Sequence, residues 1–193
     1  MTYKSSVLVI VGIFTVIASI LVINYTNFSI SGNIEYINLG GTSNSANIYV
    51  VVMGDKSFNE YLVSSFKSLG LKTSSISEFS EYKKYLFESQ KINILLIQGS
   101  LFEKYYNDDS FRMFIKELAE SRTMIYVYGK EASLLFSMLN DLGVSSFPRE
   151  VSVKVGAGYI KYNSVYESVI YGANPVDILN HYYMVLEEGG SLL

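Results

Sequence analysis

The sequence predicts an α/β protein in which a single N-terminal transmembrane helix precedes a domain with a mainly parallel sheet. Three observations support this fold class. An uncharged apolar run occupies residues 7–23, further apolar runs rich in β-branched residues lie at 47–53, 92–98 and 123–128, and helical patterns alternate with them. Strands buried on both faces are near-continuous apolar runs. Their alternation with helices favours parallel pairing through right-handed crossovers.

The first element is the membrane helix. The run Val7–Ile23 is at the short end of the length needed to cross about 30 Å of hydrocarbon. The alternative, a cleaved signal peptide, has a shorter apolar core and a small-residue cleavage site, and Asn24-Tyr25-Thr26 is a poor one. We therefore expect a retained anchor at 1–25. Lys4 and the amino terminus are the only positive charges before the helix, so the N-terminus is expected to be cytoplasmic and the domain extracytoplasmic.

One face of this helix carries small residues. Gly12, Thr15 and Ser19 fall at positions i, i+3 and i+7. Small residues let membrane helices approach closely, and a hydroxyl can bond across the contact. This face is the expected membrane helix interface, and the alternative is that the spacing arose by chance.

Residues 26–46 are rich in Asn, Ser, Thr and Gly, which favours turns and flexible backbone. We expect this segment to be an extracytoplasmic stalk or linker. Asn24 and Asn27 each begin the glycosylation acceptor pattern. Both are so close to the membrane that chance occurrence in an Asn/Ser-rich segment is the favoured interpretation.

The domain at 47–193 is expected to begin with alternating strands and helices. Ser57 and Glu60 form a capping-box pattern at the start of the first helix, which Gly70 ends. Asp109 is the expected N-cap of a later helix, and Gly143 ends the helix after it. The predicted elements are strands at 47–53, 71–76, 92–98 and 123–128, helices at 57–69, 78–89, 109–121 and 130–142, and a loop or short helix near Tyr105 and Tyr106.

The C-terminal third changes to alternating polar and apolar residues, which predicts antiparallel hairpin strands. Pro175 then begins a final helix that Gly189-Gly190 ends. The whole pattern is typical of a Rossmann-like or flavodoxin-like domain with a C-terminal hairpin and a last helix. The expected strands are 151–155, 159–162 and 165–171, with Gly156-Ala157-Gly158 as a hairpin turn.

Composition excludes several functions. The chain has 193 residues, a formal net charge of −3 and no cysteine. Disulfides, thiolate metal ligands and cysteine nucleophiles are therefore excluded. No nucleic-acid partner is expected, because such partners usually require a basic surface. We also expect no cofactor, because the sequence has no P-loop and the first strand-to-helix turn lacks the glycine pattern of a dinucleotide site.

Glycine and polar residues follow three of the buried strands. The carboxyl ends of parallel strands meet at one edge of a sheet, where open sheets bind ligands. These segments could therefore form an anion-accepting rim at helix N-termini. Ordinary strand-to-helix turns, which also need glycines and N-caps, are the favoured alternative, so a small-molecule ligand is not the leading expectation. The candidate residues are Gly54, Asp55, Lys56, Ser57, Gln98, Gly99, Ser100, Gly129 and Lys130.

No catalytic group or metal site is expected. Ser100 follows a strand and a glycine, and Asp177 precedes the only histidine, His181, by four residues, a spacing that could orient the imidazole as in a catalytic triad. Nothing in the sequence brings His181 to Ser100, so a surface or partly packed histidine is the favoured interpretation. Asp108-Asp109 could contact a cation, but the helix dipole explains two carboxylates at a helix start.

Tyrosines crowd the C-terminal third of the chain. Tyrosine is enriched at protein interfaces, so Tyr159, Tyr162, Tyr166 and Tyr171 are the expected partner surface if the hairpin lies at a sheet edge. The alternative is ordinary strand propensity in a half-buried sheet.

These observations favour a non-catalytic, single-pass membrane protein, an accessory or assembly subunit that contacts other membrane subunits and the lipid bilayer. Two alternatives stay open. The first is a membrane-tethered ligand-binding or hydrolase domain that uses the strand-end rim. The second is a cell-surface layer or filament component, which self-assembly would distinguish.

Overall fold

The computed structural model describes residues 48–79, 81, 92–146, 153–162 and 166–191. They form a mixed α/β, Rossmann-like structure on one sheet with the strand order β2-β1-β3-β4-β5-β6. The first four strands are parallel, whereas β5 and β6 each run antiparallel to the preceding strand. The strands are β1 (Tyr49–Met53), β2 (Lys72–Ile76), β3 (Ile94–Gln98), β4 (Met124–Tyr128), β5 (Gly156–Lys161) and β6 (Glu167–Tyr171).

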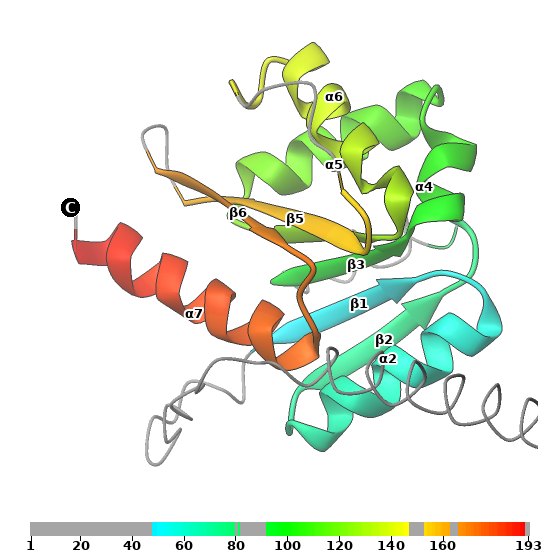
Figure 1. Cartoon of the computed structure of the whole chain (residues 1–193), viewed down its shortest axis with the longest axis vertical. Helices are drawn as coiled ribbons and strands as arrows, with labels where there is room; N and C mark the ends of the chain where they lie inside the picture. The colour runs from blue at the N-terminus through cyan, green and yellow to red at the C-terminus, as the bar shows by residue number, and fades with distance from the viewer. Residues whose placement is uncertain (1–47, 80, 82–91, 147–152, 163–165, 192–193) are drawn as a thin grey trace, which may run out of the picture. The chain divides into compact units, whose positions relative to one another are not determined.

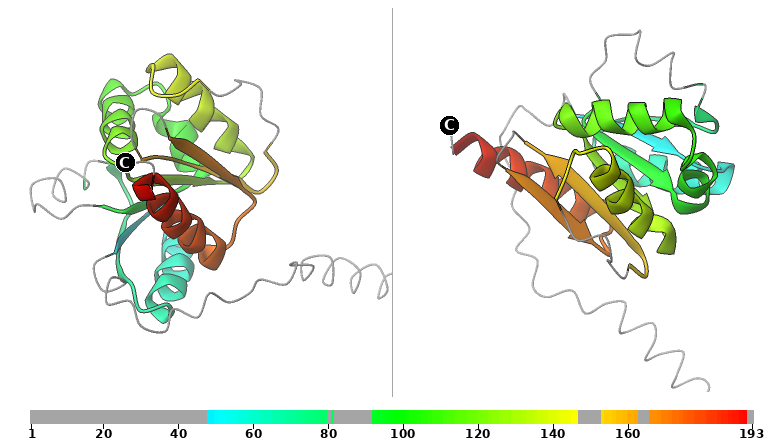
Figure 2. Two further views of the ribbon diagram at one scale, coloured as in Figure 1. Left: turned by 90° about the vertical axis from the view of Figure 1, so that its left-hand side faces the viewer. Right: turned by 90° about the horizontal axis from the view of Figure 1, so that it is seen from above.

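Helices cover both faces of this sheet (Figure 1). Three of them, α4, α5 and α6, pack on one face, while α2 and α7 pack on the other. Figure 2 shows the same layers from two further directions, with α7 beside the antiparallel part of the sheet. The helices are α2 (Lys56–Ser68), α4 (Gly99–Tyr105), α5 (Asp109–Glu120), the 3₁₀ turn η2 (Lys130–Ala132), α6 (Ser133–Asp141) and α7 (Pro175–Ser191).

The central strands are buried on both faces of the sheet. In β1, Val50 and Val52 contact the core under α2 and α7, whereas Val51 and Met53 contact the core under α4 to α6. β3 and β4 are buried except at their last residues. This confirms the strands predicted from continuous apolar runs. The weaker predicted strand at 71–76 corresponds to β2, an edge strand that is only partly buried.

Two helix N-caps differ from the prediction. α2 begins one residue earlier than expected, because the Asp55 carboxylate accepts the backbone N–H of Phe58 at 3.0 Å. The predicted capping box of Ser57 and Glu60 is therefore wrong. α5 is capped by Asp108 rather than Asp109, through a 2.8 Å bond from the N–H of Phe111.

Gly156-Ala157-Gly158 is not a hairpin turn but the start of β5, so the predicted turn is wrong. Gly158 pairs with Tyr126 of β4, and a Cβ on Gly158 would lie 2.7 Å from the Tyr126 ring. The Tyr126 hydroxyl accepts the backbone N–H of Ala173 at 2.8 Å. The glycines thus make room for a buried tyrosine under the strand. The predicted strands at 159–162 and 165–171 correspond to parts of β5 and β6, and Val153–Val155 lies outside any strand.

Several expectations fall outside the described residues. They concern the anchor at 1–25, its Gly12, Thr15 and Ser19 face, the stalk at 26–46, the sequons at Asn24 and Asn27, and most of the predicted helix at 78–89. Across the part of the chain that the structure describes, no helix has both the length and the apolar character needed to span a membrane.

Gly158→Val tests the packing of β5. We expect the added side chain to clash with the Tyr126 ring and to lower the free energy of unfolding by about 1–3 kcal/mol, as overpacked cores do. Chemical denaturation followed by circular dichroism measures this loss. Ser75→Val, at an exposed position of β2, is the matched control and should change the free energy little. An equally small change in Gly158→Val would contradict the described packing.

Candidate functional site

The candidate site lies at the carboxyl ends of β1, β3 and β4. The strand order reverses between β1 and β3, and open α/β sheets bind ligands beyond such a point. The three segments predicted to form a rim do meet there. The backbone N–H of Asp55 donates to Gln98, and a Cβ on Gly129 would lie 3.9 Å from the Cα of Gly99.

Asp55 and Gln98 bond to each other in both directions. The Asp55 N–H donates to Gln98 Oε1 at 2.8 Å, and Gln98 Nε2 donates to Asp55 Oδ2 at 2.7 Å. The other carboxylate oxygen, Oδ1, accepts the Ser57 hydroxyl at 2.9 Å as well as the N–H of Phe58. Both oxygens of Asp55 are therefore engaged inside the chain.

These bonds keep the Asp55 carboxylate charged. The backbone N–H of Phe58, the Gln98 amide and the Ser57 hydroxyl lower its pKa from 3.8 to about 2, because each donates to the ionised form. A negative charge therefore occupies the N-terminus of α2, where the predicted rim would place a bound anion.

A second carboxylate occupies the other half of the rim. A Cβ on Gly99 would lie 2.4 Å from Glu131 Oε2, and one on Gly129 would lie 2.5 Å from the same oxygen. Gly129 has a φ of 110°, a conformation that glycine adopts readily. The two glycines therefore form a cradle for the protein's own Glu131 side chain. Glu131 was missed in the sequence, although it lies two residues after the predicted Gly129.

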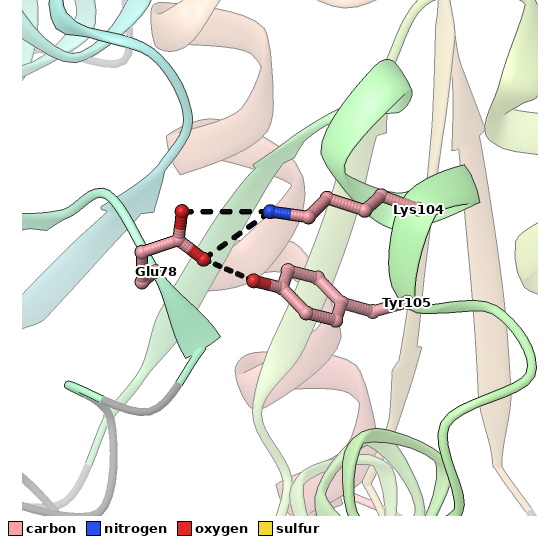
Figure 3. Close-up of polar contacts among 3 residues, drawn as sticks. All are labelled: Glu78, Lys104 and Tyr105. Atoms are coloured by element: carbon pink, nitrogen blue, oxygen red, sulfur yellow. Dashed lines mark hydrogen bonds and ion pairs between the residues drawn. The ribbon is translucent and has the colours of Figure 1, made fainter.

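A cleft of about 390 Å³ lies beside the Asp55–Gln98 pair. Ser77, Ser100 and Leu101 contribute to its walls, and its charged groups are Asp55, Lys56, Glu78 and Lys104. Figure 3 shows that Glu78 accepts hydrogen bonds from the Lys104 ammonium, at 3.3 and 3.4 Å, and from the Tyr105 hydroxyl. The Tyr105 hydroxyl and then Lys104 lower the pKa of Glu78. The lining thus carries two carboxylates and two ammonium groups, and Lys56 also lies 3.8 Å from Glu60 on α2.

Asn59 is a further site residue that sequence reasoning missed. This buried side chain donates to the carbonyl of Gly54 at 2.8 Å and to that of Ile76 at 3.1 Å, joining the ends of β1 and β2. An asparagine within a polar helical segment gives no signal of such a role.

The structure does not bring the histidine to Ser100. His181 Nε2 lies 3.2 Å from the hydroxyl of Ser168 in β6, and burial lowers the His181 pKa. Asp177 accepts the backbone N–H of Asn174 at 3.3 Å at the start of α7. His181 therefore pairs with a serine of the edge hairpin rather than with the serine at the strand-end rim.

The tyrosines divide into buried and accessible groups. Tyr159 is fully buried and donates to Glu167 at 2.8 Å, so its prediction as a partner contact is wrong. Tyr162 lies under the Arg122 guanidinium, 4.4 Å from the ring centroid, and Tyr166 bonds to Glu188. Tyr171 keeps 49% of its surface exposed.

Acidic residues near α5 serve its helix start. Asp108 caps α5, and Asp109 lies in its first turn. Within the described ranges, no three His, Asp or Glu side chains gather as a metal site would require. The chain matches no family model, and comparisons with curated proteins and with solved structures found no significant similarity.

Asp55→Asn tests the cap at the rim. We expect the variant to have a lower denaturation midpoint than the native protein at neutral pH, because it loses the charged acceptor. A lowered pKa means that this stabilisation is complete above pH 3.8 and is lost as pH falls towards 2. The difference in midpoint should therefore shrink over that range, as urea titrations at several pH values would show.

The matched control is Asp109→Asn, which removes a carboxylate from the first turn of a helix that Asp108 caps. It should have a smaller effect at neutral pH. A midpoint difference for Asp55→Asn that stays constant down to pH 2 would contradict the assigned role.

Proposed function

We propose that this protein is a non-catalytic, single-pass membrane protein that acts as an accessory or assembly subunit. The observation that carries the proposal is the occupation of the strand-end rim by the chain's own carboxylates. Asp55 bonds to Gln98 at the N-terminus of α2, and Glu131 fills the cradle of Gly99 and Gly129. In this fold class that edge is the usual ligand site, and here its polar groups stabilise the domain itself.

The location in the proposal follows from the expected membrane helix. Val7–Ile23 would span the bilayer, with the N-terminus cytoplasmic and the α/β domain extracytoplasmic. Gly12, Thr15 and Ser19 would contact another membrane subunit. The domain would be flavodoxin-like, since the order β2-β1-β3-β4-β5 is that of a doubly wound sheet, with β5 reversed.

A second candidate function is binding of a small polar ligand in the cleft beside Asp55. The cleft itself favours it, because the Ser77 and Ser100 hydroxyls and the Lys56 and Lys104 ammonium groups all line it. Its balanced charges suit a neutral or zwitterionic ligand better than a strong anion. We rank this function second because Glu78 already accepts hydrogen bonds from Lys104.

Purification from native membranes in mild detergent, with cross-linking mass spectrometry, tests the first proposal. We expect at least one membrane protein to co-purify. Gly12→Ile should reduce its recovery several-fold, because a large side chain separates the helices. Ile17→Phe enlarges a side chain on the opposite face of the helix and should leave the recovery unchanged. A monomer that purifies with no partner would contradict the proposal.

A further inference from the structure

The outer edge of β6 carries backbone groups that the sheet leaves open. Tyr162 N–H donates to Tyr166 and Gly172 N–H donates to Gly156, each at 2.9 Å. In an antiparallel ladder such pairs recur at every second residue, so residues 166, 168, 170 and 172 face β5. The peptide groups of Glu167, Val169 and Tyr171 face away from it. Among the described residues no strand pairs with this edge, which Figure 1 shows beyond β5.

The side chains of the same three residues lie on the face that bears α4 to α6. Val169 packs at the margin of that core. The Tyr171 ring lies 6.0 Å from the Phe136 ring, with half of the tyrosine exposed. Val155, also about half exposed, lines a shallow cleft of about 300 Å³ with Val153 and Tyr171. The open edge therefore continues into a mainly apolar surface, to which Lys154 also contributes.

This edge carries one charged residue, Glu167, which bonds to Tyr159, but it lacks three other features that usually prevent strand pairing. Edge strands are commonly protected by lysine, proline or a bulge. The opposite edge strand, β2, carries Lys72 and exposed serine, whereas β6 has the sequence ESVIY without lysine or proline. Its register with β5 is continuous over five residue pairs.

We infer that β6 pairs in antiparallel fashion with β6 of a second copy of this chain, with Val169 on the two-fold axis. Three outward-facing residues centred on Val169 make the strand self-complementary. In this register Val169 faces Val169 of the second copy, and Glu167 faces its Tyr171. All six open N–H and C=O groups of each strand then have partners of the right kind.

Charge and apolar surface both suit a second copy. The two Glu167 carboxylates stay apart. Each Glu167 faces Tyr171 of the other copy, four residues along the strand from the second Glu167, which is about 14 Å at 3.4 Å per residue. Each already accepts the Tyr159 hydroxyl. A second copy covers Val169 and Tyr171 of both chains at once. An isolated peptide strand would cover these residues of one chain only.

The inference does not depend on the membrane proposal, because it concerns only the described domain. It adds a homodimeric contact to whatever the membrane helix contacts. A dimer held by the transmembrane helices would leave β6 unpaired. The test must therefore show which residues meet at the contact as well as the mass of the dimer.

Single cysteines in the cysteine-free chain provide that test. In the inferred register the two Val169 Cα atoms are about 5.5 Å apart, within the range of about 4.4–6.8 Å that a disulfide spans. We expect Val169→Cys in full-length protein in detergent to form disulfide dimers at least tenfold faster than Tyr61→Cys, at an exposed position on α2. Glu167→Cys alone should react slowly, whereas a mixture of Glu167→Cys and Tyr171→Cys should react fast.

Val169→Pro supplies the second measurement. Its N–H faces outward, so proline removes no bond of the β5–β6 ladder, and circular dichroism should be unchanged. Added to Glu167→Cys and to Tyr171→Cys, it should abolish the cross-linking of their mixture, whereas Val169→Thr should not. Val169→Cys reacting no faster than Tyr61→Cys, or Glu167→Cys reacting as fast as Val169→Cys, would overturn the inference.

Discussion

The reciprocal hydrogen bonds between Asp55 and Gln98 are the interaction on which the organisation of this site depends. They join the ends of β1 and β3, where the chain order reverses, and the same carboxylate caps α2. Because a charged carboxylate accepts several N–H and O–H groups there, the helix start is satisfied without a ligand. Together with Glu131 over Gly99 and Gly129, this places the chain's own carboxylates at the usual binding edge, beside the cleft.

The antiparallel strand β5 packs closely against one tyrosine of β4. Tyr126 is buried on the α2–α7 face and holds Ala173 at the start of the last segment. Only glycine at 156 and 158 lets β5 pass beside that ring. β6 follows β5 and lies at the edge of the sheet.

Much of the sheet could be predicted from the sequence. Helices cover both faces of β1, β3 and β4, and the buried positions of these strands are apolar on both faces. The adjacency of the three rim segments followed from parallel pairing. The side chains that fill the rim could not be predicted. The position of the Glu131 side chain, for example, depends on the backbone conformation of η2. Gly156 and Gly158 have the local pattern of a turn, and only the ring of Tyr126, thirty residues away, shows why a strand needs them. Likewise, alternation placed Tyr159 in a strand without deciding which face would be buried.

Nuclear magnetic resonance of the full-length ¹⁵N-labelled protein, titrated with inorganic phosphate, would decide whether the strand-end edge is closed. With Asp55 and Glu131 occupying the two helix starts, the amide signals of Gly54, Gly99 and Gly129 should show only small, non-saturating changes. Saturable shifts at these glycines would show that an anion enters the edge, and would contradict an interpretation in which the chain's own carboxylates fill it.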